Sequence, residues 1–188
     1  MDSQTKNYQI DRLHLYSPNT NWVPINLGGI MVHFTLEEDL FSTFLNGSIT
    51  IFDKAGYFEL FPILGEEFIE VNIITGADNS FNNNARNLRG FFRIYSVSPL
   101  HRDGQTPGAT YTLMFCSTEY FTNRRTKIFD SYMDVYKQPL SYIVEYTYNN
   151  YIKNNSNDYG EQDLDTYKKN IIVEKTLRNY QILFPNVS

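Results

Sequence analysis

The chain has 188 residues, a formal net charge of −5, and a composition that is 41% hydrophobic and 16% aromatic. That is enough apolar material for one domain-sized core. The acidic balance argues against a nucleic-acid-binding surface, because affinity for phosphates comes from clustered Lys and Arg. There is no run of about 18 apolar residues, and the polar start lacks the layout of a secretion signal. We therefore expect a protein made in the cytoplasm that does not insert into a membrane.

Alternation of apolar and polar residues with period two predicts several β-strands. The positions expected on one face of these strands are Leu13, Leu15, Val32, Phe34, Leu36, Ile49, Ile51, Ile69, Val71, Ile73, Tyr111, Leu113 and Phe115. Residues 89–97 differ, because Phe91, Tyr95 and Val97 would occupy one side and Phe92 and Ile94 the other. Since both sides are apolar, this strand is expected to be sandwiched or docked against another subunit.

Two polar tracts interrupt the strands. Residues 76–86 have the composition of a long exposed hairpin tip, and residues 101–109 form a second turn with Asp103-Gly104 and Pro107-Gly108. We expect the first tract to reach a neighbouring subunit or ring.

Helical periodicity comes late in the chain. Residues 139–152 are predicted as the one long helix, because Pro139 suits a first turn and the apolar positions recur every three or four residues, at Leu140, Ile143, Val144, Thr147 and Tyr151. This stripe is expected to pack on the β-structure. Single helical turns are predicted at 56–61 and 118–123. Residues 127–136 fit either a helix or a strand, and we favour a strand over 127–132. Residues 154–165 are interpreted as a linker or surface loop.

The sequence predicts no catalytic, cofactor-binding or metal-binding residues. His14, His33 and His101 lie on separate segments, and Cys116 has no partner for an internal disulfide and no adjacent base. The carboxylate pair Glu66 and Glu67 is interpreted as strand-end charge in water, because adjacent strand residues point to opposite faces.

Fifteen Tyr and fourteen Phe exceed the obvious needs of one core. Either they serve an interface, where Tyr can be buried with its hydroxyl still hydrogen-bonded, or they reflect an AT-rich genome. The residues predicted to lie at an interface are Asn79, Phe81, Asn82, Asn83, Phe91, Tyr95, Tyr142 and Tyr146.

The order of short motifs resembles a known family. After a strand come Asp39-Leu40-Phe41, then Leu45-x-Gly47-x-Ile49-x-Ile51-x-Asp53, and then Leu60-x-Pro62-Ile63-x-Gly65-Glu66-Glu67-x-Ile69-Glu70-Val71. The pattern continues through Phe91-x-x-x-Tyr95, Tyr111-x-Leu113, Ser117-x-Glu119-x-x-x-Asn123 and the late helix. Over residues 8–188 the chain resembles the N-terminal half of the baseplate central hub protein of contractile-tailed, T-even-type bacteriophages.

The resemblance implies a mainly β (α+β) fold: a small antiparallel, tail-tube-like β-barrel or sandwich with one flanking α-helix. It implies a homotrimer whose barrels form a pseudo-sixfold ring joining the tail tube, or a tube-initiator protein, to the central spike. Other baseplate proteins would be neighbours, and DNA would only pass through. The location would be the tail baseplate of the virion, after synthesis in the host cytoplasm.

The expected organisation is a barrel domain over residues 1–125, a connecting strand, helix and acidic loop over 126–165, and the start of a second domain over 166–188. Ser188 would suit a helix N-cap with no helix after it, so we expect the chain to be the front part of a longer product. A ligand- or carbohydrate-binding β-domain of a tail-associated protein remains an alternative.

Overall fold

The computed structural model describes residues 8–42, 44–75, 86–102, 107–127, 138–153 and 171–179. The chain divides into two compact units, Met1–Ser117 and Thr118–Ser188. Three sequence-based predictions lie outside the described residues: the long polar loop within residues 76–86, the linker at 154–165, and positions 128–132 of the predicted strand.

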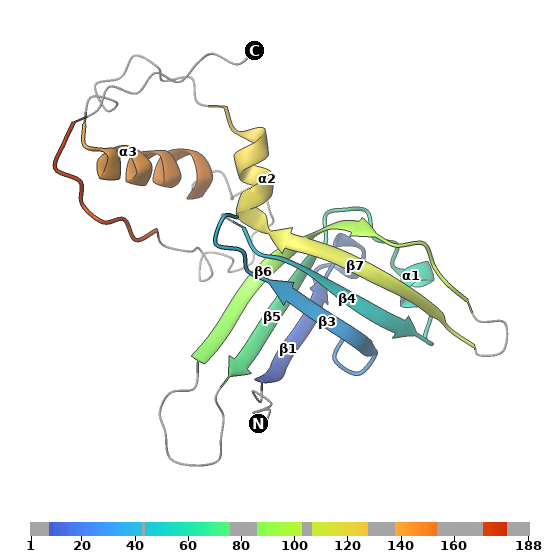
Figure 1. Cartoon of the computed structure of the whole chain (residues 1–188). Coiled ribbons are helices and arrows are strands. Elements are labelled where there is room, and N and C mark those ends of the chain that lie inside the picture. The colour runs from blue at the N-terminus through green and yellow to red at the C-terminus, as the bar shows by residue number, and fades with distance from the viewer. Residues whose placement is uncertain are drawn as a thin grey trace, which may run out of the picture. The chain divides into compact units, whose positions relative to one another are not determined.

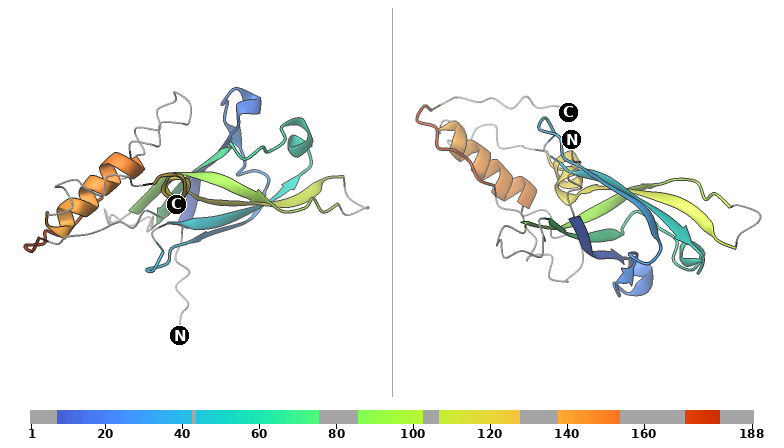
Figure 2. Two further views of the ribbon diagram at one scale, coloured as in Figure 1. Left: turned by 90° about the horizontal axis from the view of Figure 1, so that it is seen from above. Right: turned by 60° about the horizontal axis from the view of Figure 1, so that its bottom comes forward.

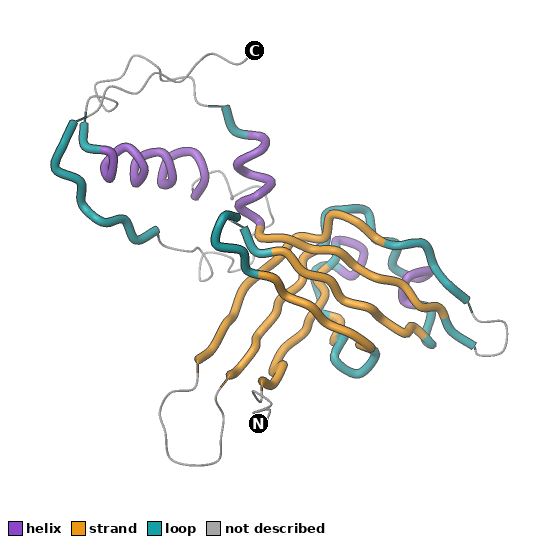
Figure 3. Tube along the Cα trace, viewed as in Figure 1, coloured by secondary structure: helices purple, strands orange, loops and turns teal. Residues whose placement is uncertain are grey.

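The first unit is a single curled antiparallel sheet (Figures 1 and 3). Its strands are β1 (Tyr8–Tyr16), β2 (Ile25–Asn26), β3 (Met31–Glu37), β4 (Asn46–Asp53), β5 (Phe68–Thr75), β6 (Arg86–Val97) and β7 (Ala109–Ser117). They follow the order β2-β1-β5-β6-β7-β4-β3. The views in Figure 2 show the sheet bending round as a half-barrel. The mainly β prediction is therefore confirmed.

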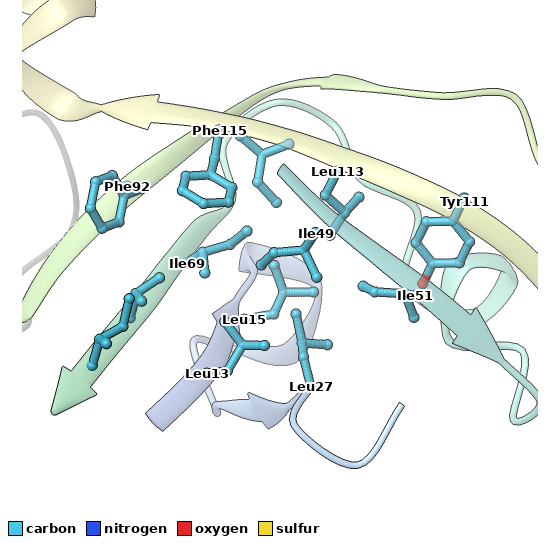
Figure 4. Close-up of a cluster of buried hydrophobic side chains, with 13 residues drawn as sticks. Leu13, Leu15, Leu27, Ile49, Ile51, Ile69, Phe92, Tyr111, Leu113 and Phe115 are labelled. Atoms are coloured by element: carbon cyan, nitrogen blue, oxygen red, sulfur yellow. The ribbon is translucent and has the colours of Figure 1, made fainter. Parts of the chain in front are cut away.

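The inner face of the bent sheet holds the apolar core. Its buried side chains come from five strands and the β2–β3 loop and point toward one another (Figure 4): Leu13, Leu15, Leu27, Ile49, Ile51, Ile69, Val71, Ile73, Phe92, Ile94, Tyr111, Leu113 and Phe115. The alternation in β1, β4, β5 and β7 thus predicted the inward side chains correctly, because β4 pairs with β7 without a register shift and β1 pairs regularly with β5 from Arg12 onward.

Two β-bulges overturn parts of the pattern. The register between β3 and β4 shifts between Met31 and His33, so that Val32 is 64% exposed instead of sharing the core face with Phe34. The register between β6 and β7 shifts between Ile94 and Ser96. Beyond that shift Val97 packs against the core, contrary to its prediction beside Phe91. Each bulge inserts an unpaired residue, which breaks the period of two.

The helices are short. In the first unit, a 3₁₀ turn, η1 (Pro18–Thr20), follows β1, and α1 (Tyr57–Leu60) follows β4. The second unit contains α2 (Thr118–Arg125), α3 (Leu140–Thr147) and the π-helical turn η3 (Tyr148–Lys153). Helical structure is confirmed at 56–61 and at 118–123, where α2 continues to Arg125. The predicted helix at 139–152 is helical throughout its described length, but α3 ends at Thr147 and the rest is the π-helical turn η3.

The apolar stripe of α3 is unevenly buried. Ile143 is buried, whereas Leu140 and Val144 are half exposed. Pro139 occupies the N-cap position, where its missing N–H costs the helix nothing. Packing of this stripe on the sheet stays a prediction, because α3 belongs to the second unit.

Candidate functional site

The predicted interface residues of β6 have different surroundings. Phe91 is partly buried, and its ring centroid lies 5.6 Å from that of Tyr16 on β1, so Phe91 packs within its own sheet. Tyr95 sits at the bulge and is half exposed. Of these two residues, Tyr95 is the one whose ring is open to a partner.

The two predicted tyrosines of α3 lie together in the second unit. The ring centroids of Tyr142 and Tyr146 are 6.4 Å apart, and the two rings are stacked. Tyr142 is half exposed. The other predicted positions, Asn79, Phe81, Asn82 and Asn83, lie outside the described residues. The structure therefore brings together Tyr142 with Tyr146, and it does not join Phe91 to Tyr95.

A charged cluster that the sequence did not predict covers the outer face of β1, β5 and β6. At its centre is Glu70, which is buried although it is charged. One carboxylate oxygen accepts from the Tyr16 hydroxyl at 2.9 Å, and the other accepts from Arg89 Nε at 3.1 Å and Nη2 at 2.8 Å. Arg12 Nη1 and His14 Nδ1 lie 3.7 and 3.5 Å from the same carboxylate. A buried carboxylate needs such donors, since an unpaired one would be very costly.

The cluster has the character of a structural network. Burial, followed by the hydrogen bond to Glu70 and the charge of Glu70, raises the pKa of Tyr16 to about 12, so its hydroxyl stays a donor at neutral pH. The Arg89 guanidinium holds the Glu70 carboxylate through two nitrogens, which fixes its orientation.

Two other buried carboxylates shape loops. Asp53 accepts from the backbone amides of Ala55, Gly56 and Phe58 at 2.8–3.0 Å and so fixes the entry into α1. Glu67 accepts from the amides of Leu64 and Gly65 at 2.8 and 2.7 Å. The prediction that Glu67 is a charge in water is therefore wrong, because its carboxylate caps a turn and is fully buried.

The most exposed apolar residues of the first unit lie between β3 and β4. Leu40 and Phe41, here called the hairpin tip, are 92% and 94% exposed. The turn that carries them is held locally, since Asp39 accepts from the amides of Phe41 and Ser42 at 3.0 and 3.1 Å. Exposed apolar side chains on an ordered turn are typical of a contact surface.

The sheet also ends without a neighbour at β3. This strand pairs with β4 on one side only, and the linear strand order leaves its other side, here called the open edge, without a strand among the described residues. Phe34 and Leu36 pack against the core from this strand but stay partly exposed. The inner face of the sheet is therefore incompletely covered beside the open edge.

Within the described part of the chain, no group of three or more His, Cys, Asp or Glu is placed to hold a metal ion. Among the same residues, none of the helices combines the length and apolar character needed to cross a membrane. No protein-family model and no curated protein matches this chain.

Proposed function

We propose that the chain is a structural module of a phage tail baseplate hub. In this role, copies of the chain form part of a trimeric pseudo-sixfold ring that joins the tail tube to the central spike and surrounds the DNA channel. The motif order over residues 8–188 and the curled antiparallel sheet both support the proposal.

The observation that carries the proposal is the uncovered apolar surface at one end of β3 and along its open edge. An exposed sheet edge is a template for pairing, and natural proteins blunt it or cover it with another chain. The hairpin tip adds two large side chains that are nearly fully exposed. Both features are suited to a chain whose exposed apolar surface is covered by neighbouring copies. In a closed symmetric ring, every copy has such neighbours.

The interior of the half-barrel argues against the ligand-binding alternative. A small-molecule site is usually a hollow lined by apolar side chains. Here the inner face is filled by large side chains, with the Phe92 and Phe115 ring centroids 5.2 Å apart and the tilted rings of Phe58 and Tyr111 5.1 Å apart. No observation in the described residues favours a carbohydrate or other small ligand.

Native mass spectrometry of the purified full chain tests the self-assembly. We expect a species containing three copies of the 22.0 kDa chain. A monomer at all concentrations would contradict the ring. Immunogold labelling of virus particles from the natural source then tests the location, with label expected at the end of the tail; label confined to host-cell material would contradict the baseplate assignment.

The passage of DNA gives a separate test. The net charge of −5 predicts that the assembled species does not bind duplex DNA, because affinity for phosphates comes from clustered basic residues. Fluorescence anisotropy with a labelled duplex at low salt measures this. Tight, salt-sensitive binding would refute the role of DNA as passing cargo.

A further inference from the structure

The open edge of β3 lacks two of the usual protections against pairing, proline and basic side chains, although the strand contains a bulge at its start. Residues 31–37 contain no Pro, Lys or Arg, and natural edge strands use these residues to block the approach of another strand. The bulge at the start of β3 leaves Val32 64% exposed. Inside the edge, Phe34 and Leu36 are covered only in part. An additional strand would satisfy the free backbone groups and cover both side chains.

A second segment of the chain has the composition of a β-strand but belongs to no sheet. Residues 171–176 read Ile-Ile-Val-Glu-Lys-Thr, a composition with high β-propensity, yet they form neither helix nor strand. Ile172 is 96% exposed. The segment is anchored at its far end, where Ser141 and Thr176 exchange hydrogen bonds of 3.1 and 3.2 Å between each backbone amide and the other side chain. Its β-branched residues therefore remain available next to a fixed point.

We propose that residues 171–175 of one copy add as a strand to the open edge of β3 in a second copy. Strand addition supplies backbone hydrogen bonds along the edge, and alternate side chains of the added strand provide selectivity. Ile171 and Val173 share one face of such a strand and cover Phe34 and Leu36. Charge favours a parallel alignment, because β3 ends at Glu37 and is followed by Glu38 and Asp39. The added segment ends in Glu174-Lys175, and Arg178 follows it, so its basic residues come near the acidic end of β3.

The proposed occupant of the open edge is another copy of this chain. Each copy offers the open edge of β3 and the segment 171–175, so head-to-tail addition uses both on every copy and closes when the rotation between copies completes a ring. The inference rests on the self-assembly in the proposed function, and it is independent of the virus in which the assembly takes place.

Matched substitutions of exposed residues test the edge and the segment. On the edge, Val32→Lys introduces a charge at the pairing site, and Val23→Lys is its control, since Val23 is a 63% exposed valine outside the strands. On the segment, Ile172→Pro removes a backbone donor, and Leu177→Pro is its control, because Leu177 is equally exposed at 96% and lies beyond the proposed strand. Sedimentation velocity of the full chain measures the association constant of each variant.

We expect Val32→Lys and Ile172→Pro each to weaken association at least about tenfold, while the controls stay within about twofold of the wild type. A thiol cross-linker should also join a Val32→Cys chain to an Ile172→Cys chain when the two are mixed. Association that is unchanged in both test variants overturns the strand addition and leaves the self-assembly standing. Cross-linking within single chains of a Val32→Cys/Ile172→Cys variant overturns it as well. A wild-type chain that stays monomeric refutes the self-assembly itself.

Discussion

Replacing Gly47 with alanine should destabilise the sheet, because two strands approach this glycine too closely for a side chain. Gly47 lies in β4, opposite Phe115 on β7 and Leu36 on β3. A Cβ added there would lie 2.4 Å from Phe115 Cζ and 2.5 Å from the backbone oxygen of Thr35. The Phe115 ring is fully buried and packs against other rings, and the Thr35 oxygen belongs to a paired strand, so neither can move away easily.

Overpacking of a core typically costs about 1–3 kcal/mol, and the double overlap places Gly47→Ala at about 3 kcal/mol. For a unit of this size that corresponds to a melting temperature lower by roughly 10 °C, measured by circular dichroism or calorimetry. Gly29→Ala is the matched control, because an added Cβ there meets nothing within 4 Å, and its effect should stay within about 0.5 kcal/mol. A Gly47→Ala protein that melts within about 2 °C of the wild type would refute the close-approach argument.

Three further predictions concern the buried polar network and α3. Arg89→Ala removes two hydrogen bonds from the buried Glu70 carboxylate and should lower the free energy of unfolding in urea by about 1–2 kcal/mol; no change would mean that the other donors suffice. The pKa of Tyr16 is raised from 10.0 to about 12, so the stability it contributes is fully present below pH 10 and is lost as the pH rises toward 12. The free energy of unfolding, measured by urea titration at several pH values between 9 and 12, should therefore fall less steeply with pH for Tyr16→Phe than for the wild type. Identical slopes of this free energy against pH would contradict the pKa shift. Ile143→Asp buries a charge and should cost at least about 3 kcal/mol or prevent folding of the second unit, whereas Leu140→Asp, at a half-exposed position of the same helix, should be tolerated; equal effects on thermal unfolding would refute this difference.

Alternation along single strands predicted most of the core because it depends only on which face a residue occupies. Ile49, Ile51, Ile69 and Val71 are completely buried, as their spacing indicated. The pattern failed at Val32, since a bulge depends on the pairing partner and leaves no mark in the strand's own alternation.

The candidate site was harder to predict, because its residues meet only through pairing of distant segments. The donors to Glu70 come from positions 54 residues earlier, at Tyr16, and 19 residues later, at Arg89. Nothing in the local sequence around either donor indicates this meeting. The open edge likewise follows from strand order: β4 pairs with β7 and β3, and only that order places β3 at the end of the sheet. The exposure of the hairpin tip had a weak local signal in the acidic residues that precede it.

The outer face of the sheet is poorly suited to drive association. We therefore expect the open edge and the hairpin tip to contribute most of the contact between copies. On β1, β5 and β6 the charges around Glu70 already satisfy one another. On β3, β4 and β7 neighbouring hydroxyls pair across the strands, with Thr50 Oγ1 3.0 Å from Thr112 Oγ1 and Thr35 Oγ1 2.6 Å from Ser48 Oγ. A partner laid over either half would have to compete with these bonds. The open edge and the hairpin tip offer unpaired backbone and exposed apolar side chains instead, so substitutions there should weaken assembly more than substitutions of equally exposed residues on the outer face.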